Sequence, residues 1–450
     1  MYYSVAVGIF IYFLMIAFFL RKKIIKYVYD PLLHSIILIW FSSFFAVPYL
    51  IYNEESRYSI LAYSDNAVMQ YILYCFVFFI IQVGIFVLFA DKGWLVTSKD
   101  ISEKVLSLKL VRRKLHLVVS AIMILPVTYA VFSIYSMVSS FGFGVYLANR
   151  IVLTSGAGYL FALLIFPSFA FLIYAVNRFM IFGVKKKYIY FGFLGITLAS
   201  APLLLSGSRS MLAMGWLMLI SAIFIISAPR GWVYQRSIIF KAGIFIIGLL
   251  LIMSTLGSVR QSAMGESDLR SVDFSHNNGS KLHVGALEGF GTNENLLWFF
   301  DNEEKIHYLY GSSLVSVLVG PIPRAMWSQK PTGGGPILKN WIAPGSYDLS
   351  SGQNISSYTT GFLPEMYMNF GWFGVFFGPI LLSIICLLFS KLILNIRSEI
   401  GLALWIVVGL RFLGLINAEF YGAWIHIFIA LMFFSIYYFF IYLFKIKEVK

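Results

Sequence analysis

Long apolar runs alternate with shorter polar connections along most of this 450-residue chain. A helix needs about 17–25 mostly apolar residues to cross roughly 30 Å of hydrocarbon. Eleven runs are long and apolar enough to meet this need: 3–20, 32–52, 67–90, 115–138, 158–177, 188–206, 211–228, 238–257, 371–390, 400–416 and 421–444. The pattern therefore predicts an all-α polytopic protein with a single membrane domain over residues 1–450.

A twelfth apolar run, 309–319, is too short to span and is interrupted by Gly311. Counting it as a span would move the basic tail 445–450 to the outside, against the positive-inside rule. We therefore expect eleven spans, with this run as a half-helix or re-entrant segment that is buried in protein or lines a cavity.

Composition excludes a soluble enzyme. Apolar residues make up 60% of the chain, charged residues only 12%, and the mean hydropathy is +0.83; soluble domains average roughly 45–50% apolar and about 25% charged. Both cysteines, Cys75 and Cys386, lie inside apolar runs, so neither a disulfide framework nor a cysteine-based zinc site is predicted. We expect no metal and no cofactor.

The net charge of +14 would suggest a nucleic-acid partner if the chain were soluble. However, 23 of the 34 basic residues fall in alternate connections, which the positive-inside rule assigns to the cytoplasm. These connections are 21–31, 91–114, 178–187, 229–241, 391–399 and the tail 445–450. The charge therefore encodes topology, with the N-terminus outside, the C-terminus inside and no nucleic-acid partner.

The connection 258–370 is far longer than the others and lies on the predicted outer face. Loops beyond about 15 residues are usually functional or disordered. This one contains Trp298, Trp327 and Trp341, which argues against disorder. We expect an ordered lid with short helices over an outer-face cavity.

Four basic residues of the outer face could bind phosphate. Arg209 ends the Ser-Gly-Ser-Arg turn 206–209, and Arg260 follows a similar glycine and serine. Arg324 and Lys330 flank a proline-rich turn that leads into three glycines, whose N–H groups could also contact an anion. The alternatives are interfacial anchors for the first two and a rigid surface turn for the second pair.

Arg411 lies within an apolar span, where a charge costs about 2.5–3.5 kcal/mol. It either pairs with another helix or faces a polar cavity. Glu365 follows Pro364 at the expected start of a span, so it is either a carboxylate that offsets the helix dipole or a general base. His283 is a second candidate base, and His426 is either a core histidine or an acyltransferase residue.

Several short motifs carry a family resemblance in their order and spacing. They are Ser206-Gly-Ser-Arg209, Tyr310-Gly311, Pro321-Ile-Pro-Arg-Ala-Met-Trp327, Lys330-Pro331 and Glu365-Met-Tyr-Met-Asn-Phe-Gly371. Together with the long outer loop before the last spans, they resemble the bacterial oligosaccharide repeat-unit polymerases, the O-antigen or Wzy-type polymerases. The resemblance is most specific over residues 305–375.

The resemblance implies a metal-independent GT-C-type glycosyltransferase in the bacterial inner membrane, with its active site facing the periplasm. Its substrates would be undecaprenyl-diphosphate-linked oligosaccharides in lipopolysaccharide biosynthesis, and its partners membrane lipids and a chain-length regulator. Glu365 and His283 would then be catalytic, and the diphosphate would be bound by Arg209, Arg260, Arg324, Lys330 and Arg411. A flippase, an O-antigen ligase and a membrane O-acyltransferase are the alternatives.

Overall fold

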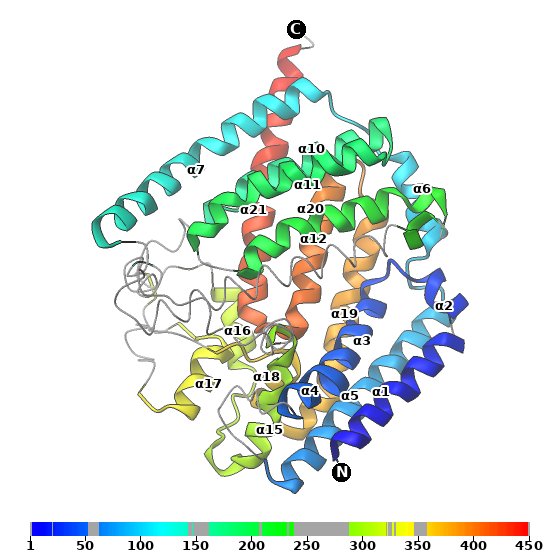
Figure 1. The fold of residues 1–450 in the computed structure, drawn as a ribbon, viewed down its shortest axis with the longest axis vertical. Helices are drawn as coiled ribbons and strands as arrows, with labels where there is room; N and C mark the ends of the chain where they lie inside the picture. The colour runs from blue at the N-terminus through cyan, green and yellow to red at the C-terminus, as the bar shows by residue number, and fades with distance from the viewer. Residues whose placement is uncertain are drawn as a thin grey trace, which may run out of the picture. The chain divides into compact units, whose positions relative to one another are not determined.

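In the computed structural model, the described residues are 2–19, 21–52, 63–142, 146, 162–206, 209–231, 234–237, 288–320, 322, 326–327, 330–345 and 358–448. Within these ranges every regular element is helical, and the sole extended pairing is an isolated parallel bridge between Lys109 and Ser398 (Figure 1). The expected all-α class is confirmed for this part of the chain.

The chain forms two compact units, each assembled from segments distant in sequence. The first comprises residues 1–99, 283–392 and 411–426, and the second comprises residues 100–282, 393–410 and 427–450. The single membrane domain expected from the sequence stays a prediction.

The first unit contains five α-helices and one π-helix from the N-terminal quarter, and several short helices from the long connection. The former are α1 (Tyr2–Phe19), α2 (Arg21–Lys26), α3 (Pro31–Phe41), which continues through the π-helix η1 (Ser42–Ala46) into α4 (Val47–Tyr52), and α5 (Asp65–Asp91). The latter are η7 (Glu288–Asn293), α15 (Glu294–Asp301), η8 (Glu303–Lys305), α16 (Ser312–Val319), α17 (Gly334–Ile342) and α18 (Phe362–Phe370). After α18 come η9 (Gly371–Phe373), α19 (Gly374–Asn395) and η10 (Leu415–Asn417).

Aromatic side chains join the short helices of the long connection to the N-terminal helices. Phe299 and Phe300 of α15 are buried, and the Phe300 ring lies 4.8 Å from that of Tyr367 on α18 and 6.1 Å from that of Tyr74 on α5. Each such aromatic buries about 150–250 Å² and so contributes strongly to packing. Among the described residues of 258–370, Trp298, Phe299, Phe300, Phe362 and Tyr367 belong to one hydrophobic core, whereas Tyr310 and Trp327 are exposed.

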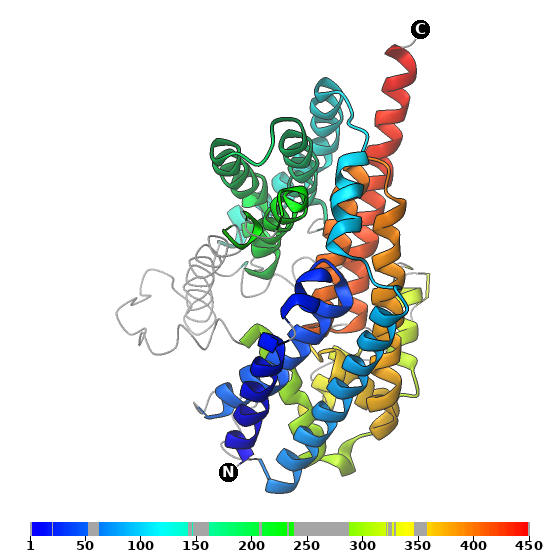
Figure 2. The same ribbon diagram turned by 90° about the vertical axis from the view of Figure 1, so that its right-hand side faces the viewer.

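The second unit contains α6 (Ser98–Ser107), α7 (Arg113–Phe141), α10 (Phe166–Phe182), α11 (Lys186–Ser200), η2 (Ala201–Ser206), α12 (Arg209–Ile226) and η3 (Ala228–Arg230), with most of α20 (Glu399–Gly414) and α21 (Phe420–Glu448). Helices α10, α11 and α12 pack against one another, and Figure 2 shows them nearly end-on.

Six helical stretches are long and apolar enough to cross a membrane: Pro31–Tyr52, Asp65–Asp91, Arg113–Ser140, Phe362–Asn395, Glu399–Asn417 and Phe420–Phe444. Three shorter apolar helices are Ser4–Ala17, Phe166–Phe182 and Ala213–Ile226. Helix occurs in ten of the eleven expected ranges, and the eleventh, 238–257, lies outside the described residues. The chain is therefore a membrane protein, while the count of eleven crossings stays a prediction.

Candidate functional site

Glu365 lies in the first turn of α18, which begins after Gly361. Gly361 has a φ of +82°, a conformation that glycine adopts readily. The helix begins at Phe362, two residues before Pro364, which the sequence pattern had placed first. Pro364 is tolerated because the first four N–H groups of a helix have no partner within it. The Glu365 side chain is fully buried, whereas the sequence had suggested a carboxylate at the membrane surface.

The two oxygens of the Glu365 carboxylate accept hydrogen bonds from other helices. Oε1 accepts from Ser313 Oγ on α16 at 2.8 Å, and Oε2 accepts from the backbone N–H of Phe420 at 2.7 Å. No side chain caps the N-terminus of α18. The carboxylate therefore connects α16, α18 and the start of α21 and does not cap its own helix.

Asn369, one turn after Glu365 on α18, orients Ser313. Its Nδ2 donates to Ser313 Oγ at 2.8 Å and to the Glu365 carbonyl oxygen at 2.7 Å. Its Oδ1 accepts from the Gly311 N–H at 2.9 Å. Because the Ser313 hydroxyl accepts from Asn369, its single hydrogen points to Glu365. The serine thus presents an O–H to the carboxylate in a fixed direction.

A second carboxylate, that of Glu419, lies at the N-terminus of α17. Its Oε2 accepts from the Gly335 N–H at 2.7 Å, and a Cβ on Gly335 would lie 2.7 Å from that same oxygen. A Cβ on the preceding Gly334 would lie 3.4 Å from Glu365 Oε1. The distance at Gly334 is an ordinary contact, whereas at Gly335 only glycine lets the Glu419 carboxylate approach the backbone this closely. We call Ser313, Glu365, Asn369 and Glu419 the carboxylate cluster.

The partial positive charge of a helix N-terminus favours an anion at this position. Burial raises the pKa of Glu419, and the hydrogen bond from Gly335 opposes that rise. The sequence predicted that the glycine run would contact an anion through its N–H groups. In the structure, the anion that Gly335 contacts belongs to the chain itself.

The predicted phosphate-binding cations fall into two groups. Lys330 is buried, and its Nζ donates to the carbonyl oxygens of Gly320 at 2.8 Å and Ile322 at 2.6 Å. Arg411 is also buried and lies close enough to His426 to interact with it electrostatically. Arg411 lies on α20 and His426 on α21. An ion pair of Arg411 with another helix, or its contact with a polar cavity, stays a prediction.

The remaining predicted residues cannot be placed in this way. Arg209 is the first residue of α12, but its side chain lies outside the described part. Arg260, Arg324 and His283 lie outside the described residues altogether. Their roles in binding diphosphate or in catalysis stay predictions.

Sequence reasoning missed three members of the carboxylate cluster. Asn369 could have been found, because it lies four residues after Glu365 and so on the same helix face. Ser313 and Glu419 contact the site from 52 and 84 residues away from their partners, and no local pattern reveals them. A separate buried carboxylate, Glu294, accepts from Tyr63 Oη at 2.8 Å.

Among the described residues, no group of three or more His, Cys, Asp or Glu side chains is placed to hold a metal ion. No family model, curated protein or solved structure matches this chain.

Proposed function

We propose that this protein is a polymerase of O-antigen type, a GT-C-like glycosyltransferase with about eleven spans in the bacterial inner membrane. The observation that carries the proposal is the meeting of two motifs of the resemblance around Glu365. Backbone N–H groups of Leu309 and Tyr310 donate to the carbonyl oxygens of Met368 and Asn369, each at 3.0 Å. Tyr310-Gly311 and the Glu365–Gly371 motif thus form one hydrogen-bonded unit, and Asn369 of that unit also donates to Ser313, the serine that contacts the Glu365 carboxylate.

The proposed reaction transfers a growing glycan from undecaprenyl diphosphate to the terminal sugar of a lipid-linked repeat unit. A bond forms between the acceptor hydroxyl oxygen and the donor anomeric carbon. The bond from that carbon to the diphosphate oxygen breaks, and undecaprenyl diphosphate leaves with the electron pair. A base must accept the hydroxyl proton, and cations must stabilise the leaving diphosphate.

Glu365 is the proposed base. Its Oε1 already accepts a hydrogen bond from a hydroxyl, that of Ser313, at 2.8 Å. In the mechanism, movement of α16 lets the acceptor hydroxyl take the place of the serine hydroxyl, within the roughly 2.6–3.2 Å that proton transfer requires. His283 is the alternative base from the same predicted outer face.

Arg209, Arg260, Arg324 and Lys330 are the proposed diphosphate ligands, with Arg411 supporting them from within its helix. The positive-inside rule assigns the connection after α20, which includes Glu419, to the outer face. That assignment supports a periplasmic active site. Lys330 would have to exchange its contacts with Gly320 and Ile322 for the diphosphate.

Deletion of the gene followed by gel analysis of the surface polysaccharide tests the reaction class. A polymerase deletion leaves single repeat units attached to the lipid A core, because ligation continues without polymerisation. Loss of every attached unit would instead indicate a ligase or a flippase and would contradict the proposal. His426→Ala separates the acyltransferase alternative, which requires that imidazole.

Replacement of the proposed base gives a sharper test in the deletion strain. We expect Glu365→Gln to shorten the polymer to single units, since an amide cannot accept the proton, with a rate loss of roughly 10²–10⁴-fold. Glu304→Gln, on an exposed carboxylate of the same long connection, is the matched control and should restore normal chain length. Equal amounts of inserted protein must be shown by immunoblotting. Full-length polymer from Glu365→Gln would remove this residue from catalysis.

A further inference from the structure

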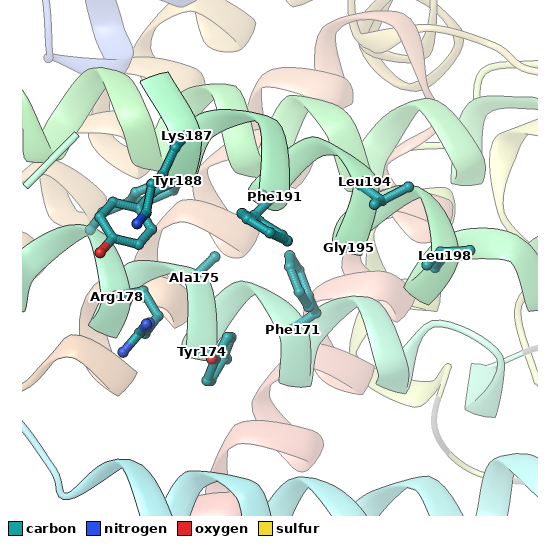
Figure 3. Close-up of a pocket in the computed structure, with 12 residues that line it drawn as sticks. Phe171, Tyr174, Ala175, Arg178, Lys187, Tyr188, Phe191, Leu194, Gly195 and Leu198 are labelled. Atoms are coloured by element: carbon teal, nitrogen blue, oxygen red, sulfur yellow. The ribbon is translucent and has the colours of Figure 1, made fainter. Parts of the chain in front are cut away.

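A groove runs between α10 and α11 of the second unit, remote in sequence from the carboxylate cluster. Its volume is about 480 Å³, within the roughly 300–1,000 Å³ that small-molecule sites occupy. Figure 3 shows that the side chains lining it are sorted by polarity along its length. Arg178, Lys187 and Tyr188 lie at one end, and Leu194 and Leu198 lie at the other.

Two glycines of α11 shape this groove. A Cβ on Gly195 would collide with the ring of Phe171, which lies directly over it. A Cβ on Gly192 would lie 3.1 Å from the Phe179 ring and 3.3 Å from Leu219. The absence of side chains at these positions lets the rings of α10 approach α11, and Phe171 and Phe191 face one another midway along the groove (Figure 3).

Aromatic rings position the two cations at the polar end. The Arg178 guanidinium carbon lies 4.2 Å from the Phe182 ring centroid and 5.7 Å from that of Tyr188. Lys187 Nζ lies 5.3 Å from the same Tyr188 centroid. Both cations thus flank one tyrosine, and the exposed Lys185 and Lys186 adjoin them in sequence. The local charge is strongly positive.

The surrounding sequence supplies no acid to balance that charge. Between Glu103 and Glu266 the chain contains neither Asp nor Glu, and this interval includes all of α7, α10, α11 and α12. Of the acids elsewhere in the second unit, Glu399 accepts its contacts from His116, Asn177 and Val111. The positive charge at the polar end of the groove therefore favours binding of an anion from outside the chain.

The length of the groove matches one membrane leaflet. From Lys187 to Leu198 is eleven residues, or about 16 Å along a helix. Half of the hydrocarbon thickness is about 15 Å. The connection 178–187 is among those assigned to the cytoplasm, and basic pockets between helices on that side bind anionic lipid headgroups.

We propose that the α10–α11 groove binds one anionic phospholipid of the inner leaflet. Its phosphate lies between Arg178 and Lys187, and one acyl chain follows Phe171 and Phe191 to Leu198. The proposal concerns binding alone and does not depend on the proposed glycosyl transfer.

Native mass spectrometry of the purified full chain in detergent tests it. Titration with phosphatidylglycerol should fill one high-affinity site, and phosphatidylcholine should bind it at least tenfold more weakly. The double variant Arg178→Gln/Lys187→Gln should lose about tenfold or more of the phosphatidylglycerol affinity, as expected for removing two cations. Its matched control is Arg113→Gln/Lys114→Gln, which removes two exposed cations from the start of α7 and should bind normally.

Leu194→Trp provides an independent variant, because Leu194 is 58% exposed and its enlargement fills the groove without disturbing the core. It should block binding while leaving both cations in place. Equal affinities for the two lipids would overturn the proposal, as would equal losses in the charge variant and its control. A dimer that Leu194→Trp converts to a monomer without change in lipid binding would instead assign the groove to a second copy.

Discussion

At the scale of single residues, Asp30 is a buried carboxylate with a structural role. Its Oδ1 accepts from the Leu32 N–H at 2.9 Å and caps α3, and its Oδ2 accepts from the Val96 N–H at 3.0 Å. Burial raises the pKa of Asp30 to about 6, and these hydrogen bonds limit the rise. Its ordinary value is 3.8, so the folded state holds this proton more tightly than the unfolded state does.

This difference predicts a pH dependence of stability. Between pH 3.8 and 6 the folded chain binds more protons at Asp30, so the free energy of unfolding falls as the pH rises through this window. The loss amounts to about 3 kcal/mol and is complete above pH 6. Chemical unfolding in detergent should show it as a steeper decline for the wild type than for Asp30→Asn. Parallel pH profiles for the two proteins would contradict the assignment.

Residue chemistry explains which part of the candidate site was foreseeable. Glu365 was identified because an acid follows a proline at the start of an apolar run. Its burial was not foreseeable, because the groups that contact it, Ser313 and Phe420, are more than 50 residues away in sequence. The contacts of Lys330 were not foreseeable either. Its charge suggested an anionic ligand, but its ammonium group donates to two backbone carbonyl oxygens.

At the scale of elements, one buried network ties four helices of the second unit together. His116 of α7 lies 3.0 Å from Glu399 Oε1 of α20 and 3.1 Å from the Tyr437 hydroxyl of α21. Asn177 of α10 donates to the same Glu399 oxygen at 3.2 Å, and the Val111 N–H donates at 2.6 Å. One carboxylate oxygen, Glu399 Oε1, thus contacts three nitrogen atoms from different parts of the chain.

Removal of that oxygen should destabilise the second unit. Glu399→Leu removes the partner of the Val111 N–H and of His116 Nε2, and one of the two acceptors of Asn177 Nδ2. Each buried donor left without a partner costs about 1–3 kcal/mol. Glu399→Gln keeps an oxygen in place and should cost about 1 kcal/mol. Thermal unfolding in detergent would measure both variants. Equal midpoints for the leucine and glutamine variants would show that the network adds little.

Element boundaries show where sequence periodicity succeeds. The run 67–90 became α5 over Asp65–Asp91, and the run 421–444 became α21 over Phe420–Glu448. The run 371–390 begins at Gly371, where α18 ends and η9 begins. The helix α18 before this boundary was not foreseen as a separate element. Gly371 has a φ of +56°, and a Cβ there would lie 2.9 Å from the Tyr308 ring, so a distant residue fixes this boundary.

At the scale of the whole molecule, charge patterning predicts which connections face each side of the membrane. Ser107 lies near the middle of the basic connection 91–114, and Glu304 lies in the long connection 258–370. Both are exposed, so a cysteine at either position would be accessible from its own side. The native Cys75 and Cys386 are buried and give little background labelling.

A membrane-impermeant maleimide should therefore label Glu304→Cys in spheroplasts and Ser107→Cys only after the membrane is permeabilised. This result would place the long connection on the periplasmic face, as the proposed glycosyl transfer requires. It would place the connection 91–114 on the cytoplasmic face, to which the charge pattern also assigns the Arg178–Lys187 end of the groove. The reverse pattern would contradict the positive-inside assignment. The reverse pattern would also separate the two proposals. A groove that faces the outer leaflet could still bind an anionic lipid, whereas Glu365 on the cytoplasmic side could not act in a periplasmic polymerase.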